Sequence, residues 1–495
     1  MECSVTYQFK TKPFKHQLDE FKKHLHTTAR GILWEQGTGK TKLVIDETCA
    51  LFELDEIDAL FVLAPPGVHL NWITDELPAH VPDHILTNLR SHVWQTSKTG
   101  TKWHAKALDD LVKHEGLAVL TMSFDGFMTE KGKEAAWRFL RRRRAMYVVD
   151  EGHNIKTPKA KRTQSVVKSA KYAPFRRLLT GTPIAVGPFD IYSQLRFVDE
   201  SIWKRIGLEN FSAFKFHFGE WYTAAEHQRD HGYDPGFDKF IAFKNMDELY
   251  NIVHSVSSRV TKESAGLNLP PKLYSKRYFE LNGEQARVYR ELKEEFLSEF
   301  EDGKVVEGQL AIVRLLRLQQ VACGYAHVGD DEPTRLLGNH NPLLDQLLEV
   351  TEGLGHQAIV WARFTKDIDQ LMDALPGAVR YDGKMTDDEC ARNKAAFQAG
   401  DAQFFVGNQA KGKEGLTLIG AKSTLYYSNS FKLIDRLQSE DRNHRIGQDE
   451  PVNYYDFEGR LPDGSPTVTR HIINALRRKF DIASQITGDE LREWI

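Results

Sequence analysis

The segment Trp34–Val44, WEQGTGKTKLV, constrains the fold of this chain more than any other stretch. It follows the apolar residues 31–33 and leads into a helical pattern over residues 41–52. A strand, a tight glycine-containing turn and a helix in this order form a cradle for phosphate. The turn points backbone N–H groups inward, and the helix presents the positive end of its dipole to the anion.

The residue types in this turn suit a bound nucleotide. Gly37 and Gly39 allow the sharp turn, because glycine tolerates backbone angles that other residues avoid. Lys40 can reach the β- and γ-phosphates, and the Thr41 hydroxyl can bind Mg²⁺. The strict phosphate-loop pattern has glycine where this chain has Trp34. The alternative is an ordinary glycine-rich turn before a helix, but the strand–loop–helix context favours a nucleotide site.

Length and composition set wider limits. A chain of 495 residues is too long for one core and predicts roughly three domains. The net charge of −3 argues against a uniformly basic coat for nucleic acid, yet it allows a local basic groove. The four cysteines are far apart and no histidines have metal-ligand spacing, so we expect no zinc site and a reducing compartment. No stretch approaches the ~20 apolar residues of a membrane span, which predicts a soluble protein. We expect it in the cytoplasm or associated with the nucleoid, or in the host cell cytoplasm if the protein is viral.

Short apolar runs after the phosphate loop predict strands buried in a parallel sheet. They are Ala59–Ala64, Leu117–Met122, Met146–Val149 and the start of Leu178–Ile184. Because helical stretches alternate with them up to about Val198, the first domain is expected to be doubly wound. The turn after the last run contains Thr182, whose hydroxyl can couple the nucleotide site to a bound strand or cap the next helix.

Two acidic residues follow the run at Met146–Val149. Side chains at the carboxyl end of a parallel strand lie where α/β sheets bind ligands. Asp150 can hold Mg²⁺, and Glu151 can orient and deprotonate an attacking water. The alternative is a strand that ends in a polar turn, but the upstream phosphate loop makes the catalytic interpretation the better one.

The alternating pattern returns in the second half of the chain. We expect strands and helices at Ala358–Trp361, Asp367–Leu375, Ala378–Tyr381, Asp387–Ala399 and Phe404–Gly407. Between the halves, the aromatic stretch Phe211–Tyr222 predicts a helical core, Asn268–Lys272 predicts a connector, and Asn282–Glu301 and Gln309–Cys323 predict helices. The expected domains are residues 1–200, 201–340 and 341–495, the last ending in a helix over Val468–Trp494.

Two basic segments of the second half are candidate sites. The glycine-containing turn at Ala410–Leu416 carries Lys411 and Lys413 and suits close approach to a phosphate backbone. Arg442 and Arg445 are three residues apart, so we expect them on one face of a helix, where they can clamp a γ-phosphate. The alternative is a surface helix whose arginines pair with its own acidic residues.

The order of these motifs resembles the Swi/Snf family of helicase superfamily two. The resemblance runs from Phe14 to about Gly459 and rests on EQGTGKT, VLAPPGVHLNW, VVDEGHNIK (a DEAD/DEAH-like box), LLTGTPI, SRVTKESAGLNLPPK and DRNHRIGQ. Gly152 and the AKGKEGLTL segment depart from the family's usual residues. Because no additional module is evident, the chain is similar to the compact bacterial or viral members that translocate on double-stranded DNA.

The resemblance implies two RecA-like doubly wound parallel-sheet domains with helical insertions between them, and it implies ATP and Mg²⁺ as ligands. The residues implied to act in catalysis are Lys40, Glu151, Arg442 and Arg445. Those implied to bind nucleotide are Gln17, Gly37, Thr38, Gly39, Lys40, Thr41 and Gln438, with Thr41 and Asp150 on the metal. Those implied to contact nucleic acid are Asn71, Trp72, Lys156, Thr182, Lys411 and Lys413.

The expected function is therefore a DNA-dependent ATP hydrolase that translocates along double-stranded DNA and remodels protein–DNA complexes or DNA junctions. A strand-separating DNA or RNA helicase is the alternative within enzymes. A nucleotide-gated DNA clamp without productive turnover is the alternative of another class. Double-stranded DNA is the expected partner, without membrane or zinc. The sequence is compatible with a monomer and does not identify protein partners.

Overall fold

The structure is a computed structural model that describes residues 7–233, 236, 238–301, 308–326, 334–413 and 416–487. The chain divides into two units, the first mainly from Met1–Glu226 and Asp238–Asn268, the second mainly from Leu269–Asp481. The boundary between Asn268 and Leu269 falls within the predicted connector. Each unit is described by itself.

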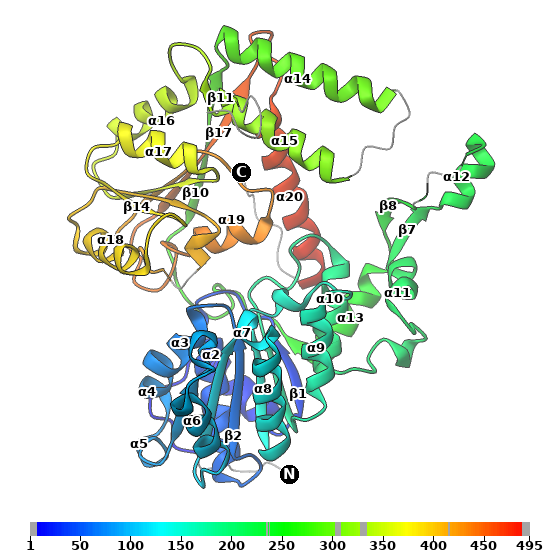
Figure 1. Ribbon diagram of the computed structural model, residues 1–495, viewed down its shortest axis with the longest axis vertical. Coiled ribbons are helices and arrows are strands. Elements are labelled where there is room, and N and C mark those ends of the chain that lie inside the picture. Colours follow the sequence, from blue (N-terminus) through cyan, green and yellow to red (C-terminus); the bar gives the residue numbers. More distant parts are fainter. Residues whose placement is uncertain are drawn as a thin grey trace. The chain divides into compact units, whose positions relative to one another are not determined.

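The first unit is built on a seven-stranded sheet in the order β3-β4-β2-β5-β6-β1-β9. Figure 1 labels β1 and β2 of this sheet. All its strand pairs are parallel, as the apolar runs predict. The strands are β1 Ala29–Ile32, β2 Ala59–Ala64, β3 Arg90–Val93, β4 Ala118–Ser123, β5 Ala145–Asp150, β6 Phe175–Leu179 and β9 Ser257–Ser258.

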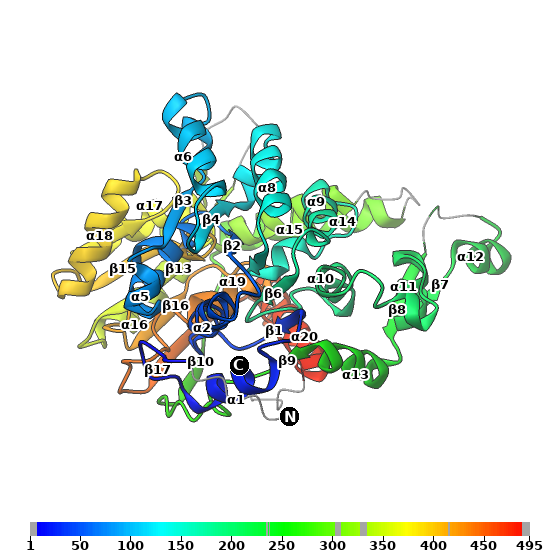
Figure 2. The ribbon, with the colours of Figure 1, turned by 90° about the horizontal axis from the view of Figure 1, so that it is seen from below.

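Helices cover both faces of this sheet, because successive side chains of a strand point to opposite sides. Phe61 and Leu63 of β2 belong to one core, whereas Leu60 and Val62 belong to the other. Figure 2 shows α8 and α2 on opposite sides of the strands. The helices are α1 Lys15–His24, α2 Lys40–Glu53, α3 Val68–Asn71, α4 Leu77–His80, α5 Asp83–Leu86, α6 Lys102–Val112, α7 Phe124–Met128, α8 Glu130–Arg142, α9 Lys161–Ala170 and α10 Ile191–Val198.

The aromatic stretch after α10 is only partly helical. Phe211–Phe218 forms α11, and its Phe214 and Phe218 are buried in the first unit's core, as expected. The remainder, Gly219–Tyr222, is instead strand β7, which pairs antiparallel with β8. Within the described residues, the insertion therefore contains the helices α11, α12 and α13 and an antiparallel strand pair, with α12 between the two strands, rather than helices alone. These elements are β7 Gly219–Tyr222, α12 Ala224–His231, β8 Lys239–Phe243 and α13 Met246–Val256.

The second unit has a six-stranded sheet in the order β10-β17-β16-β13-β15-β14, and all its strand pairs are also parallel. The predicted class of two parallel-sheet α/β domains is confirmed. The strands are β10 Lys272–Glu280, β13 Ala358–Ala362, β14 Ala378–Tyr381, β15 Phe404–Asn408, β16 Ser423–Tyr426 and β17 Val452–Arg460, with a separate pair β11 Tyr325–Ala326 and β12 Arg335–Leu336.

Helices pack on both faces of the second sheet as well. They are α14 Gly283–Glu301, α15 Gly308–Ala322, α16 Pro342–Glu352, α17 Thr365–Ala374, α18 Asp387–Ala399, α19 Leu433–Glu440 and α20 Val468–Thr487. The rest of the predicted final helix, residues 488–494, lies outside the described residues. Among the described helices, each is too short or too polar to traverse a lipid bilayer.

Candidate functional site

The glycine-rich turn joins β1 to α2 as the sequence predicts. Gly37 and Gly39 have φ angles of 82° and 83°, in the left-handed region that favours glycine. Gly39 directly precedes α2, so the N-terminus of that helix opens into the turn. The Lys40 ammonium curls back into the loop and donates to the carbonyls of Trp34 and Glu35, at 3.0 and 3.2 Å. A cation held among main-chain groups at a helix N-terminus is the arrangement that binds phosphate.

Gln17 of α1 is bonded directly to this loop. Its amide nitrogen donates to the Gly39 carbonyl at 2.8 Å, and its amide oxygen accepts from the Phe14 N–H at 2.7 Å. The side chain is 1% exposed. A β-carbon at position 39 would collide with this amide. Gly39 is therefore required twice, for its backbone angle and for the close approach of Gln17.

Asp150 is a buried carboxylate at the carboxyl end of β5. The Trp72 indole donates to its Oδ2 at 3.0 Å, and the Glu151 N–H donates to its Oδ1 at 2.9 Å. Burial raises the pKa of Asp150 to about 6, with a further contribution from the Glu151 charge. The Trp72 hydrogen bond and the Lys40 charge act in the opposite direction on this pKa.

Glu151 stands in an unusual backbone conformation. Its φ is 54°, in the left-handed region that non-glycine residues rarely adopt. The backbone N–H and side-chain amide of Asn154 both donate to the Glu151 carbonyl, at 3.0 and 2.9 Å, and hold this conformation. The His153 Nδ1 lies 3.2 Å from Glu151 Oε2. Such strain at an acidic residue beside a phosphate loop is typical of active sites.

The residues present also fit Mg²⁺. Thr41, in the first turn of α2, and Asp150 offer a hydroxyl and a carboxylate, the oxygen ligands that Mg²⁺ prefers. Mg²⁺ commonly takes only one or two protein ligands and completes its shell with water and substrate phosphates. Within the described residues no three His, Cys, Asp or Glu side chains gather to hold a metal.

The segment 258–262, just before the boundary at Asn268, runs beside the phosphate loop, which sequence reasoning did not predict. The Ser258 carbonyl accepts from the Leu33 N–H at 2.9 Å, and the Arg259 guanidinium donates to the Leu33 and Gly181 carbonyls, at 2.5 and 3.3 Å. The buried Lys262 donates its N–H to Glu35 Oε2 at 2.6 Å. The basic stretch SRVTK was the only signal for these contacts, because the two-residue strand β9 is too short to predict.

The candidate nucleic-acid residues occupy different environments. Trp72 is 1% exposed and engaged with Asp150, so its position suits the acidic site rather than a nucleic-acid surface, whereas the neighbouring Asn71 is exposed. Lys156 Nζ lies 3.4 Å from Asp190 Oδ2.

The remaining candidate nucleic-acid residues, Thr182, Lys411 and Lys413, also lie in different parts of the chain. Thr182 is half-buried and its N–H donates to the Thr180 hydroxyl at 3.2 Å. Lys411 Nζ lies 4.0 Å from Asp387 Oδ1. The Lys413 side chain lies outside the described residues.

The prediction that Arg442 and Arg445 share a helical face is wrong. Helix α19 ends at Glu440, and both arginines lie in the irregular segment 441–447, called here the arginine segment. The two guanidinium groups nevertheless converge, because each donates to the Leu416 carbonyl at 3.3 Å. Arg442 also donates to the Gln438 carbonyl at 2.9 Å.

The alternative places these residues on a surface helix, and that placement is also wrong. Glu440 is fully buried and pairs with Arg436 and Lys272. Gln438, expected at the nucleotide, is 6% exposed.

Comparison with known families identifies the chain. Residues 16–325 match the SNF2-related domain, and residues 339–447 match the helicase conserved C-terminal domain. The chain belongs to the SNF2 family of helicase-like ATPases. The resemblance noted from the motifs is thus confirmed.

Curated relatives of this SNF2-family chain include a "Chromodomain-helicase-DNA-binding protein 1-like" of Danio rerio, 24% identical over 86% of this chain and 39% of the relative. Another is the "Chromatin structure-remodeling complex subunit snf21" of Schizosaccharomyces pombe, 24% identical over 91% of this chain and 37% of the relative. The chain thus spans less than half the length of both relatives.

Among solved structures, the "Sulfolobus solfataricus SWI2/SNF2 ATPase core in complex with dsDNA" aligns with 97% of this chain and 95% of its own, at 20% identity and a TM-score of 0.41.

Proposed function

We propose that this chain is an ATP hydrolase, stimulated by double-stranded DNA, that uses hydrolysis to translocate along the duplex and to remodel protein–DNA complexes or junctions. The observation that carries the proposal is the arrangement of the first unit's loop and acidic pair. Lys40 curls into a phosphate loop, and its charge acts on the buried Asp150 beside a strained Glu151. This set provides phosphate binding, a metal ligand and a base within one unit.

Each residue has a separate task in the proposed reaction. Lys40 and the loop N–H groups bind the β- and γ-phosphates, and Thr41 and Asp150 hold Mg²⁺, which neutralises charge on the phosphates when bound. Glu151 accepts a proton from the attacking water. The hydrogen bond from Asn154 to the Glu151 carbonyl fixes the main chain from which this carboxylate extends. Gln17 contacts the adenine after its amide leaves the Gly39 carbonyl.

We assign Arg442 and Arg445 to the stabilisation of charge that develops on the γ-phosphate, worth about a thousandfold or more in rate. Gln438 lies four residues before Arg442, its carbonyl accepts from the Arg442 guanidinium, and we assign it to the same nucleotide. Because the arginines belong to the second unit, hydrolysis would depend on the arrangement of both units. DNA that binds to both units would in this way control the rate of ATP hydrolysis.

Duplex DNA would be bound mainly through its phosphates, which gives little sequence preference and strong salt dependence. We propose Asn71, Lys156, Thr182, Lys411 and Lys413 as contacts, and we assign Trp72 to the acidic site instead. We further propose the domain limits 1–200, 201–340 and 341–495, action as a monomer, and a location with the cell's DNA.

The test is steady-state ATP hydrolysis without DNA, with single-stranded DNA and with duplex DNA at equal low salt. We expect strong stimulation by duplex, and a loss of about 100-fold or more in Lys40→Ala and Glu151→Gln. Lys102→Ala is the matched control, because Lys102 is also the first residue of a helix, α6, but is itself exposed. Stimulation by single strands alone would favour a strand-separating helicase. DNA binding without hydrolysis would favour a clamp.

A further inference from the structure

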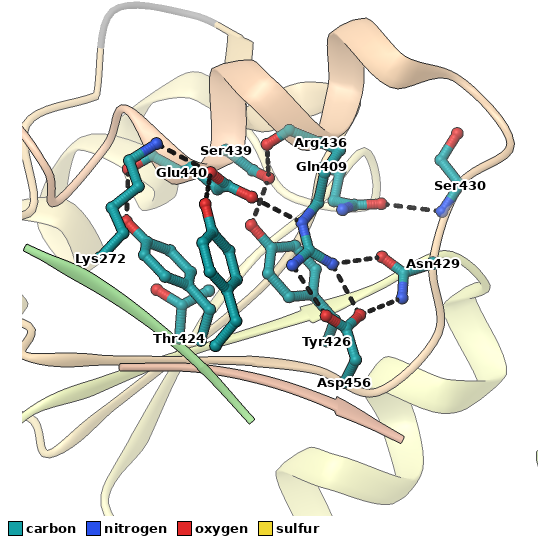
Figure 3. Close-up of polar contacts among 12 residues, drawn as sticks. Lys272, Gln409, Thr424, Tyr426, Asn429, Ser430, Arg436, Ser439, Glu440 and Asp456 are labelled. Carbon is teal, nitrogen blue, oxygen red and sulfur yellow. Dashed lines mark hydrogen bonds and ion pairs between the residues drawn. The ribbon is translucent and has the colours of Figure 1, made fainter. Parts of the chain in front are cut away.

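A buried cluster of charges lies beside α19, immediately before the arginine segment (Figure 3). Arg436 is at its centre and pairs with both oxygens of Asp456, at 2.6 and 2.8 Å. Its Nε donates to Glu440 Oε1 at 2.8 Å, and its guanidinium lies over the Tyr426 ring, 3.5 Å from the centroid. These four side chains are at most 1% exposed.

Lys272 completes the charge balance of this cluster. Its Nζ donates to Glu440 Oε2 at 2.8 Å, and the Tyr274 hydroxyl donates to the same oxygen at 2.9 Å. Burial alone would raise the pKa of Glu440, but the charges of Lys272 and Arg436 lower it to about 2. Glu440 is therefore ionised at neutral pH, and two cations, the buried Arg436 and the partly buried Lys272, face two buried carboxylates.

Buried ion pairs seldom stabilise a fold more than apolar packing would, yet loss of one partner is costly. A role in orienting the chain that follows α19 accounts better for this cluster than a role in stability. It joins the last residue of α19, Glu440, to strands β10, β16 and β17, and Arg442 follows only two residues later. The Tyr454 hydroxyl, also from β17, donates to the Glu440 carbonyl at 3.1 Å.

The arginine segment follows α19 through two backbone hydrogen bonds, from the Asp441 N–H to the Leu437 carbonyl and from the His444 N–H to the Glu440 carbonyl, both at 3.2 Å, and side-chain contacts also hold it. The Asn443 amide donates to the Thr424 hydroxyl at 3.0 Å, and His444 Nε2 donates to the Pro270 carbonyl at 2.7 Å. Pro270 and Lys272 both lie where the chain enters the second unit. The arginine segment is thus fastened to that entry directly by His444–Pro270, and the residue immediately before the segment is fastened to it by Glu440–Lys272.

We propose that Lys272 and Glu440 are positioning residues for the two arginines. Through them, the entry of the chain into the second unit helps to set the orientation of the Arg442 and Arg445 guanidinium groups. This inference rests on the proposed function, in which the arginines act on the nucleotide. It adds residues that contact neither nucleotide nor DNA and that act only through the arginine segment.

Lys272→Met tests the proposal in the full chain with duplex DNA. We expect kcat for ATP hydrolysis to fall by about 10- to 100-fold, as for a small misplacement of a catalytic group, with an unchanged KM for ATP. Lys272→Arg should restore most of kcat, because it keeps the charge. Glu440→Gln keeps the side-chain shape and should repeat the loss even if Lys272→Met does not fold.

Lys276→Met is the matched control. Lys276 is on the same strand and also pairs with a glutamate, at 3.6 Å from Glu458, but its side chain is 35% exposed and its partner lies on β17 rather than α19. We expect its kcat to equal that of the wild type. An equal loss in Lys276→Met would show that the effect comes from β10 in general and would overturn the proposal.

A double-mutant cycle separates positioning from stability. In a background that carries both Arg442→Ala and Arg445→Ala, measured by single-turnover hydrolysis, Lys272→Met should cause little further loss, because it acts through the two guanidinium groups already removed. Independent, multiplicative losses would overturn the proposal, as would a lowered thermal midpoint with unchanged kcat. Absence of hydrolysis in the wild type would overturn the proposed function and this inference together. Full activity of Lys272→Met in an active enzyme would overturn the inference alone.

Discussion

Replacement of Trp72 by phenylalanine tests how the acidic site is kept ionised. The indole N–H donates to Asp150 Oδ2 at 3.0 Å, in a position where Trp72 is 1% exposed. Phenylalanine keeps most of the buried ring but cannot donate this hydrogen bond. Because the bond favours the ionised carboxylate, its loss should raise the pKa of Asp150 above about 6.

The magnitude follows from the strength of the bond. A hydrogen bond to a charged group contributes about 1.5 to 3 kcal/mol. Since one pKa unit corresponds to about 1.4 kcal/mol, the lower value moves the pKa of Asp150 up by about one unit. At pH 7 the protonated fraction would rise from about 10% to about half. A protonated Asp150 is a poor Mg²⁺ ligand, so activity at neutral pH should fall and recover at higher pH.

The measurement is kcat/KM for ATP against pH, which reports ionisations of the free enzyme. We expect the midpoint of the acidic limb to move upward by about one unit in Trp72→Phe. Trp94→Phe is the control, because Trp94 is buried in the same unit and its indole N–H has no hydrogen-bond partner within the described residues. An unshifted limb in Trp72→Phe, or an equal shift in Trp94→Phe, would refute the reasoning.

Two further changes address the loop and the core. Gln17→Ala removes the hydrogen bonds to the Gly39 carbonyl and from the Phe14 N–H. KM for ATP, measured by ATP titration, should rise several-fold. The free energy of unfolding, measured in urea, should fall by about 1 to 3 kcal/mol. Arg177→Met leaves the fully buried Glu47 without its partner at 2.8 Å, so the free energy of unfolding should fall by about 3 to 5 kcal/mol. The double variant Arg177→Met, Glu47→Leu should recover most of that stability in the same urea assay. Equal stability of the single and double variants would contradict this account of the pair.

Several elements have the limits that the sequence patterns predicted, and among them β2 is apolar and buried throughout. The limits of β2 at Ala59–Ala64, β14 at Ala378–Tyr381 and α18 at Asp387–Ala399 agree with the predicted ones. An apolar run has few alternative environments, because its side chains must be removed from water. The phosphate loop was equally predictable, since its glycines serve a defined backbone geometry.

Strands that carry buried charge were not recognised. β17 includes Asp456 and β10 begins with Lys272, and both side chains take part in the cluster beside α19. In the sequence they interrupt the apolar pattern, and only a partner distant along the chain makes their burial acceptable. The same limit applies to the arginine segment, where a three-residue spacing suggested a helix but long-range contacts through Asn443 and His444 maintain an irregular chain.

The departure from the strict phosphate-loop pattern at Trp34 has a physical explanation. The φ angles that require glycine occur at Gly37 and Gly39, not at Trp34. The Trp34 indole is fully buried and donates to the Ser258 hydroxyl at 2.9 Å, while its carbonyl accepts from the Lys40 ammonium. A side chain at this position therefore has both space and a hydrogen-bond partner, supplied by a strand more than 200 residues later in the chain. The loop can therefore keep its phosphate-binding geometry although Trp34 replaces the pattern's first glycine. The replacing residue also bonds the loop to β9.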